Sequence, residues 1–178
     1  MNDSFREIST YGTGLKTLFD FEYLNRGDHA WSNDRKSIAF LSFDDSDFPS
    51  LHVMNAANFT EQRLLVDASG FYSFGNLSWS PDDSKISFTG IPRLQAASFG
   101  EIYVVNVNDG SFRKLHDSQT LSTAPVWSPD GTKIAFMKTV GEEAIAINVI
   151  DANSSEKREV VRIKQSIVNE PMDWQSIY

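Results

Sequence analysis

The sequence contains no cysteine, and this absence excludes disulfide bonds, thiolate metal ligands and cysteine nucleophiles. Histidine is almost as scarce, with three among 178 residues. His29, His52 and His116 share no local spacing typical of a metal site, so we expect each of them to have a structural or surface role. No run of about eighteen apolar residues occurs, which predicts that the chain inserts no helix into a membrane.

Basic residues are also fewer than acidic ones. The chain has 16 Lys and Arg against 24 Asp and Glu, which gives a formal net charge of -8. Binding to nucleic acid depends on clustered basic side chains, so nucleic acid is excluded as a leading partner. The opening residues, MNDSFREIST, include charges and no apolar run of signal-peptide length, so no export signal is expected in the chain. The 40% of hydrophobic residues are enough for the core of one ordinary domain.

Tryptophan occurs four times, and its spacing organises the chain. Trp31, Trp79, Trp127 and Trp174 follow one another at intervals of 48, 48 and 47 residues. A repeat of this length without long helical periodicity is typical of four-stranded β-propeller blades. We therefore predict an all-β fold, a β-propeller of four-stranded antiparallel blades, with three full blade repeats and partial blades at both termini.

The same strand-turn-strand pattern surrounds the first three tryptophans. Ile stands seven residues and Phe nine residues after each of them, with a small residue between. Residues two apart in a strand share a face, so these side chains are predicted to point into one packing layer. An Asp in each turn is predicted to accept backbone N–H groups, a structural role. The repeat positions are Ile38, Ile86 and Ile134; Phe40, Phe88 and Phe136; and Asp34, Asp82 and Asp130.

Third and fourth strands follow in each copy. We predict third strands at LHVMN, EIYVVN and AINVID, and more polar fourth strands at RLLVD, FRKLH and REVVRI. At the N-terminus, SFREIS and LKTLFDF are predicted to be the third and fourth strands of an earlier blade, and MDWQSIY at the C-terminus the first strand of a closing one. The expected division is 1–27 for the partial N-terminal blade, about 28–76, 77–124 and 125–171 for the three blades within 28–171, and 172–178 for the closing strand, all in one domain.

The motifs WSPDGTKIAF, EIYVVN and NDG resemble those of the TolB-like β-propeller family, whose blades repeat a Trp-Ser-Pro-Asp-Gly turn, an Ile-Ala-Phe strand and an Ile-Tyr-Val strand. The likeness covers nearly the whole chain and is weakest at Trp31. It implies a bacterial propeller protein and, because the family is largely exported, a periplasmic or extracytoplasmic location. The family includes translocation components, peptidase propellers and polysaccharide-active proteins, so the resemblance specifies fold more closely than function.

Three full blades are fewer than the roughly six or more that the family's rings contain. The terminal strands could close a ring of about four blades within one chain, or combine between two chains in a larger two-fold ring. The sequence could also be a portion of a longer propeller. An isolated monomer would expose apolar blade faces and unpaired strand edges. We therefore expect self-association into a homo-oligomer that completes a ring.

Two loops between second and third strands are expected to lie at one ring face, where propellers bind partners. The first, FDDSDFPS at 43–50, contains Asp44, Asp45 and Asp47, which are weak candidates for a cation site and otherwise a solvated acidic loop. The second, GIPRLQAASFG at 90–100, is apolar with a lone Arg93. The rings of GFYSFG, at 70–75, are expected to be buried where the chain crosses between blades.

Residues for catalysis are not apparent. The chain has no Gly-x-Ser-x-Gly nucleophile motif, and it lacks the clustered histidines that lyases on related propellers place around a metal. We expect no cofactor and no enzymatic activity of its own, and a function as a protein-interaction scaffold. The alternatives are a partial propeller of a carbohydrate- or peptide-acting enzyme that needs self-association or a missing domain, and a purely structural propeller fragment.

Overall fold

The computed structural model describes residues 4–7, 16–20, 28–45, 47–59, 62–93, 99–116, 120–141, 144–154 and 156–164. Its strands are β1 (Ser4–Glu7), β2 (Lys16–Asp20), β3 (His29–Trp31), β4 (Ser37–Phe43), β5 (Pro49–Asn55), β6 (Arg63–Val66), β7 (Phe71–Trp79), β8 (Lys85–Pro92), β9 (Glu101–Asn106), β10 (Phe112–His116), β11 (Ser122–Trp127), β12 (Lys133–Val140), β13 (Ala144–Asp151) and β14 (Lys157–Lys164). A 3-10 turn, η2 (Ala68–Gly70), precedes β7. No helix within these ranges is long and apolar enough to cross a membrane.

Twelve of these strands form three four-stranded sheets, in which consecutive strands pair antiparallel. The first blade is β3–β6, the second β7–β10 and the third β11–β14. Each blade begins with the strand that ends at its tryptophan, and the Ile-x-Phe strand comes second. The predicted all-β fold of four-stranded blades is thereby confirmed.

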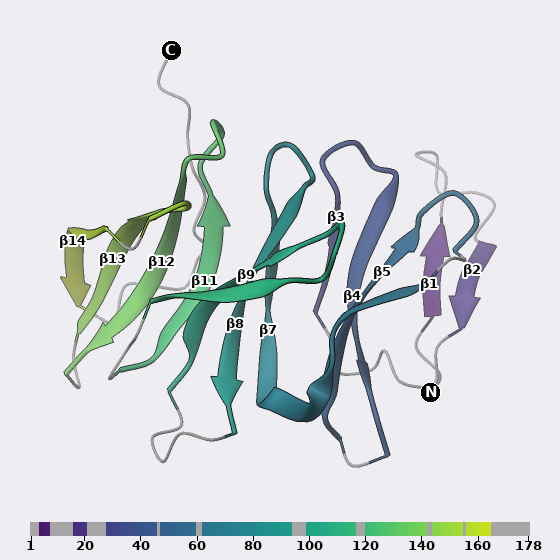
Figure 1. Cartoon of the computed structure of the whole chain (residues 1–178), viewed down its shortest axis with the longest axis horizontal. Coiled ribbons are helices and arrows are strands. Elements are labelled where there is room, and N and C mark those ends of the chain that lie inside the picture. Colours follow the sequence, from purple (N-terminus) through teal and green to yellow (C-terminus); the bar gives the residue numbers. More distant parts are fainter. Residues whose placement is uncertain are drawn as a thin grey trace.

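The blades stand in an open row (Figure 1). The N-terminal strands β1 and β2 pair with each other as a separate two-stranded sheet at one end of the row, and the third blade lies at the other end. The described residues therefore do not close a ring of four blades. The closing strand expected at 172–178, including Trp174, lies outside the described residues.

The first strands of the second and third blades begin earlier than the motif indicates. The expected boundaries at 76/77 and 124/125 fall inside β7 and β11. Each strand contains a register shift, between Gly75 and Ser78 and between Thr123 and Val126, and the shifted segments contain Asn76 and Ala124 with φ of 54° and 53°. A bulge interrupts the alternation that marks a strand in a sequence, so the segment before it was not recognised as strand.

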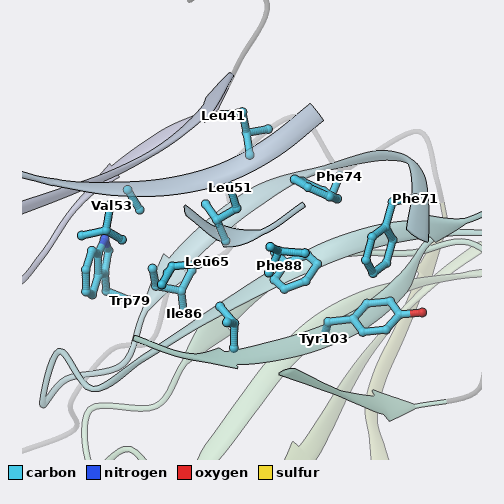
Figure 2. Close-up of a cluster of buried hydrophobic side chains, with 13 residues drawn as sticks. Leu41, Leu51, Val53, Leu65, Phe71, Phe74, Trp79, Ile86, Phe88 and Tyr103 are labelled. Carbon is cyan, nitrogen blue, oxygen red and sulfur yellow. The ribbon is translucent and has the colours of Figure 1, made fainter. Parts of the chain in front are cut away.

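The core lies between blades rather than within them (Figure 2). Between the first two blades, Leu41 and Leu51 of the first blade face Trp79, Ile86 and Phe88 of the second, in a cluster whose members are at most 7% exposed. A second cluster joins the second and third blades through Ile102, Val104, Trp127, Ile134 and Phe136. Ile38, Phe40 and Met54 form a third cluster on the other face of the first blade. The repeated Ile and Phe of the second and third blades thus point toward the preceding blade.

Each buried tryptophan also makes one hydrogen bond to the preceding blade. The indole Nε1–H of Trp79 donates to the carbonyl of Ala30 at 2.9 Å, and that of Trp127 donates to the carbonyl of Ser78 at 3.1 Å. Both acceptors stand immediately before the tryptophan of their own blade. Trp31 is 41% exposed, against 7% for Trp79 and 6% for Trp127. The first indole therefore lies at an end of the row where no complete blade covers it.

The aspartates in the turns between first and second strands accept hydrogen bonds from residues of the same turn. In the second blade, Asp82 accepts hydrogen bonds from the Ser80 and Ser84 hydroxyls at 2.6 and 2.9 Å and from the Ser84 backbone N–H at 3.1 Å. These donors, the Ser80 hydroxyl first, lower the pKa of Asp82 to about 2. The equivalent bonds from Ser128 and Thr132 lower the pKa of Asp130 to about 2.

Neighbouring turns also contact each other. Asp83 has φ of 57°, and its carboxylate accepts the backbone N–H of Asn33 at 2.7 Å and of Asp34 at 2.9 Å. The equivalent residue of the third blade is Gly131, with φ of 69°. A Cβ at Gly131 would lie 3.6 Å from Pro81 Cδ, and proline has no N–H to donate. At position 83, a carboxylate can accept backbone N–H groups of the facing turn. At position 131, a carboxylate would face Pro81, which has no N–H group to donate.

Candidate functional site

The two loops between second and third strands meet at one edge of the blades. Phe48 precedes β5 in the first blade, and Arg93 follows β8 in the second. The guanidinium carbon of Arg93 lies 3.4 Å from the centroid of the Phe48 ring and 5.9 Å from that of Tyr72. A guanidinium above an aromatic face is attracted by the ring's electron density. The two loops are thereby linked across the blade interface.

Arg93 is fixed in place by the strand beside it. Its Nε–H donates to the carbonyl of Phe71 at 3.1 Å, and its backbone N–H donates to the carbonyl of Gly70 at 3.0 Å. Phe71 is itself buried at 3% exposure and contacts Phe74, Phe88 and Tyr103 edge to face. The stacked cation is therefore held by the aromatic core rather than by a free loop.

Three exposed apolar side chains lie around this edge of the second and third blades. Tyr72 is 56% exposed at the start of β7, Leu121 is 43% exposed just before β11, and Phe99 is 37% exposed before β9. Among the rings of GFYSFG, Phe71 and Phe74 are buried and Tyr72 is not, and all three lie within β7 rather than on a crossing segment. We call Phe48, Tyr72, Arg93, Phe99 and Leu121 the loop edge.

The acidic loop next to the loop edge is organised by its own backbone. The Asp44 carboxylate accepts the Phe48 N–H at 2.9 Å, and the Asp44 carbonyl accepts the Asp47 N–H at 2.9 Å. Asp47 has φ of 62°. Asp44, Asp45 and Asp47 are all exposed. Among the described residues no group of three His, Asp or Glu side chains is placed to hold a metal ion, this loop included.

The histidines fall in separate strands. His29 lies in β3, His52 in β5 and His116 in β10. His52 shares a hydrogen bond of 2.9 Å between its Nε2 and the Ser42 hydroxyl, and its ring stacks on Phe40 at 5.4 Å. Burial lowers the pKa of His52. A serine and a neutral histidine in contact are two members of a nucleophilic triad, but a third group that orients the imidazole is not shown among the described residues.

A polar chain runs along the first strands of the three blades. The Asp28 carboxylate accepts the backbone N–H of Asn76, and the Asn76 side-chain oxygen accepts the Thr123 hydroxyl at 2.7 Å. Asn76 stands 48 residues after Asp28. Asp28, Asn76 and Ala124 occupy the same position in successive repeats, so the spacing of the repeat marks the position of this polar chain. The position could not be recognised from the sequence, because the residue type differs in each repeat.

The contact of Arg93 with Phe48 was also not predicted. The sequence indicates that both loops lie at one ring face, and their meeting follows from that placement. The pairing itself depends on the length of each loop and on the Nε bond to Phe71, which no local pattern encodes.

Comparison with known proteins identifies the family to which the repeat belongs. The model of the TolB beta propeller domain matches residues 28–172. Among curated proteins, dipeptidyl-peptidase 5 of Porphyromonas endodontalis is 26% identical over 122 residues, which is 67% of this chain. The chain spans 17% of the length of that relative.

Solved structures agree on the fold. A putative TolB from Agrobacterium tumefaciens superposes with a TM-score of 0.71 at 18% identity, covering 90% of this chain and 57% of the other. An oligogalacturonate lyase in complex with manganese superposes with a TM-score of 0.69 at 15% identity, covering 90% of this chain and 48% of the other. Since the family model covers most of the chain and the blades match in three dimensions, the chain belongs to the TolB beta propeller domain family.

Proposed function

We propose that the chain is a non-enzymatic interaction scaffold whose loop edge binds a protein partner. The observation that supports this proposal best is the cluster of the exposed Tyr72 with the half-buried Arg93 and Phe48, in which Arg93 is fixed by its hydrogen bond to the Phe71 carbonyl. Tyrosine and arginine are enriched among the few residues that contribute most of the binding energy at protein interfaces. A rigid cluster loses little conformational freedom on binding.

Charge defines the kind of partner. Asp44, Asp45 and Asp47 stand beside the cluster, and the chain has a formal net charge of -8. A protein surface that offers apolar side chains ringed by Lys and Arg would match the exposed rings and the acidic rim together. Binding to such a surface is expected to weaken as salt rises, because exposed charges are screened.

Site-specific photo-crosslinking tests the scaffold function. A photoreactive phenylalanine analogue at position 72 is expected to form a discrete protein adduct in cells of the source organism, and Arg93→Ala in the same chain is expected to reduce it. The matched control has the analogue at Lys36, in an exposed turn at the opposite edge of the first blade. Adducts of equal yield and size from both positions, or none from position 72, would contradict the proposal.

A second candidate is the propeller part of an enzyme that acts on peptides or oligosaccharides. It is supported by the similarity to dipeptidyl-peptidase 5 and by the fold shared with oligogalacturonate lyase. The test is incubation of the chain with peptides and oligogalacturonate, with and without manganese, followed by product analysis. Turnover that copurifies with the chain and is lost in Ser42→Ala or His52→Ala would replace the scaffold proposal.

A further inference from the structure

The third blade has a small polar residue where the other two blades have a ring. The third-strand residue that pairs with the repeated phenylalanine is His52 in the first blade, Tyr103 in the second and Asn148 in the third. The His52 and Tyr103 rings stack on their phenylalanines with centroids 5.4 Å apart. Asn148 has no ring to stack on Phe136, although it is buried at 6% exposure. The face of the third blade toward the second therefore lacks a ring that the other blades have.

Two further positions on this face differ in the same direction. Phe74 in β7 pairs with Gly90 in β8. At the equivalent positions of the third blade, 48 residues later, Ser122 pairs with Lys138. In the second blade, the Phe71 ring lies so close to Gly90 that a Cβ there would approach it within 2.7 Å. A hydroxyl and an ammonium thus replace a ring and a glycine, and an aromatic region of the second blade corresponds to a polar region of the third.

A cavity of about 390 Å³ lies in this polar region, a volume within the usual range of small-molecule sites. Its lining includes Thr120, Lys138, Asn148, Glu159 and Arg162. Lys138 and Arg162 pair with the same residue of β13, and Glu159 pairs with Asn148 two positions further along that strand. Paired residues, and residues two apart in a strand, share a face. The four side chains therefore gather on the face that carries Phe136.

A bulge in β14 brings Glu159 and Arg162 onto that face. Residues three apart in a regular strand point to opposite faces. The register of β14 shifts opposite Ile147 and Asn148, which leaves Val160 as an extra residue. Arg162 therefore reaches the Glu159 carboxylate, and it donates to it through Nε at 3.2 Å and through Nη2 at 3.0 Å. This ion pair fixes the guanidinium and leaves its Nη1 group outside the pair.

The charges at the cavity leave one positive charge in excess. Among the described lining residues, Lys138 and Arg162 oppose the single carboxylate of Glu159. The hydrogen bond from Arg162 lowers the pKa of Glu159, and the nearby positive charges of Arg162 and Lys138 lower it further. This carboxylate is therefore ionised at neutral pH. The formal net charge of the whole chain is -8, so a local excess of positive charge stands out.

The buried amide of Asn148 is poorly satisfied. Among the described residues, its side chain makes one hydrogen bond, a long one of 3.5 Å from Nδ2 to the carbonyl of Ala146. A buried amide can make up to four hydrogen bonds, and each one left unmade costs free energy. Since Asn148 lines the cavity, a molecule bound there can supply the missing partners.

We propose that this cavity binds a small organic ligand through a carboxylate group. Lys138, the Nη1 group of Arg162 and the amide of Asn148 are donors, and a carboxylate accepts several hydrogen bonds from such groups. A single negative charge neutralises the excess positive charge, whereas a dianion would add repulsion with Glu159. The oxygens of Glu159 and Asn148 favour a ligand that also carries hydroxyl or amide N–H donors. Both hydroxy acids and peptide C-termini have this chemistry. The site is separate from the protein-binding function proposed for the loop edge.

NMR titration of the isotopically labelled full chain tests the site and distinguishes the two sources. The acidic probes are gluconate and acetyl-dialanine, and the matched neutral probes are sorbitol and acetyl-dialanine amide. We expect at least one acidic probe to shift the Asn148 side-chain amide signal saturably below about 20 mM, with no shift from its neutral match. Gluconate alone would indicate a hydroxy acid, and acetyl-dialanine alone a peptide C-terminus. No shift from either acid, or equal shifts from an acid and its neutral match, would overturn the proposal.

Substitutions locate the binding. Lys138→Gln is expected to weaken it by about tenfold, because a charge-assisted hydrogen bond is lost. Lys133→Gln is the matched control, since it makes the same change of charge on the same strand but on the opposite face, and it is expected to bind like the natural chain. Equal affinities of these two variants would overturn the proposal, because the cavity would then not be the site.

A filling variant gives a second readout. Asn148→Tyr restores the ring that the second blade has at this position, and it is expected to abolish binding while the chain still unfolds cooperatively on heating. A folded Asn148→Tyr chain that binds the acidic probe as tightly as the natural chain would contradict the site. If this variant fails to fold, the comparison of Lys138→Gln with Lys133→Gln still decides the question.

Discussion

At the scale of single residues, each buried tryptophan both packs against the preceding blade and donates a hydrogen bond to it. Trp79 buries its ring against the first blade and donates its N–H to the carbonyl of Ala30. Trp127 does the same with the second blade. Since the acceptor precedes the neighbouring tryptophan by one residue in both cases, the indole fixes the register of one blade against the next.

Replacing the indole measures that contribution. Trp79→Phe is expected to lower the free energy of unfolding by about 1–3 kcal/mol, because the hydrogen bond and part of the buried ring are lost together. Trp31→Phe, the matched control, is expected to change it by less than about 0.5 kcal/mol, because the first indole is 41% exposed. Urea unfolding of the two variants gives the comparison. Equal losses would mean that the bond to Ala30 contributes nothing.

The turn aspartates give a second prediction at this scale, through pH. The pKa of Asp82 is about 2 in the folded chain against an ordinary 3.8, so folding favours the charged carboxylate. The stability that this provides is present above about pH 4 and is lost as the pH falls through about 2. Asp82→Asn is therefore expected to be less stable than the natural chain near pH 6, with a difference that shrinks between pH 4 and pH 2.

Thermal unfolding at a series of pH values measures this difference. Ser80→Ala retains the carboxylate and removes its first donor, so this variant should show a smaller effect of the same sign. A melting-temperature difference for Asp82→Asn that stays constant down to pH 2 would show that the carboxylate does not supply it.

At the scale of elements, the strands and tight turns could be predicted from the sequence. Alternation around Ile86 and Phe88, the Pro and Gly of the turns and the Trp period are local signals, and they indicated the strand order of all three blades. The bulges at Asn76 and Ala124 could not be predicted, because one extra residue reverses the alternation without leaving a mark of its own. The expected boundaries at 76/77 and 124/125 fall inside β7 and β11 for that reason.

The candidate site was harder to predict from the sequence than the fold. The sequence placed the acidic loop and Arg93 on one edge, but the stacking of Arg93 on Phe48 depends on tertiary distances. The equivalent placement of three arginines in the fourth strands, each paired with a valine of the third strand, was hidden for another reason. Arg63, Arg113 and Arg158 stand 32, 34 and 31 residues after their tryptophans, because the loops in between differ in length. A fixed period cannot detect residues that only the pairing of strands brings into one row.

The contact between neighbouring turns gives a prediction for a pair of elements. Asp83→Gly relieves a left-handed backbone but removes the acceptor for the N–H groups of Asn33 and Asp34, and we expect a net loss of about 1 kcal/mol. The reverse change, Gly131→Asp, is expected to cost about 1–2 kcal/mol, because φ is 69° and Pro81 offers no N–H. Urea midpoints measure both. A neutral Gly131→Asp would show that the facing turn does not decide which residue is tolerated there.

At the scale of the whole molecule, the row of blades has two unlike ends. One end presents Trp31 and the pair β1–β2, and the other presents Arg158 beside an open cavity. Each interior interface contains an indole that donates to the preceding blade and an arginine that donates to a turn of the following blade. Among the described residues, these contacts join the three blades into one row.

Hydrogen exchange of the indole Nε1–H groups, followed by NMR and assigned with Trp→Phe variants, tests the central claim that the tryptophans join blades face to face. At a concentration where the chain is monomeric, Trp79 and Trp127 are expected to exchange at least about a hundred times more slowly than Trp31, because among the described residues their indole N–H groups alone donate to a neighbouring blade. Equal rates for the three indoles, or a Trp31 as protected as Trp79, would contradict the account.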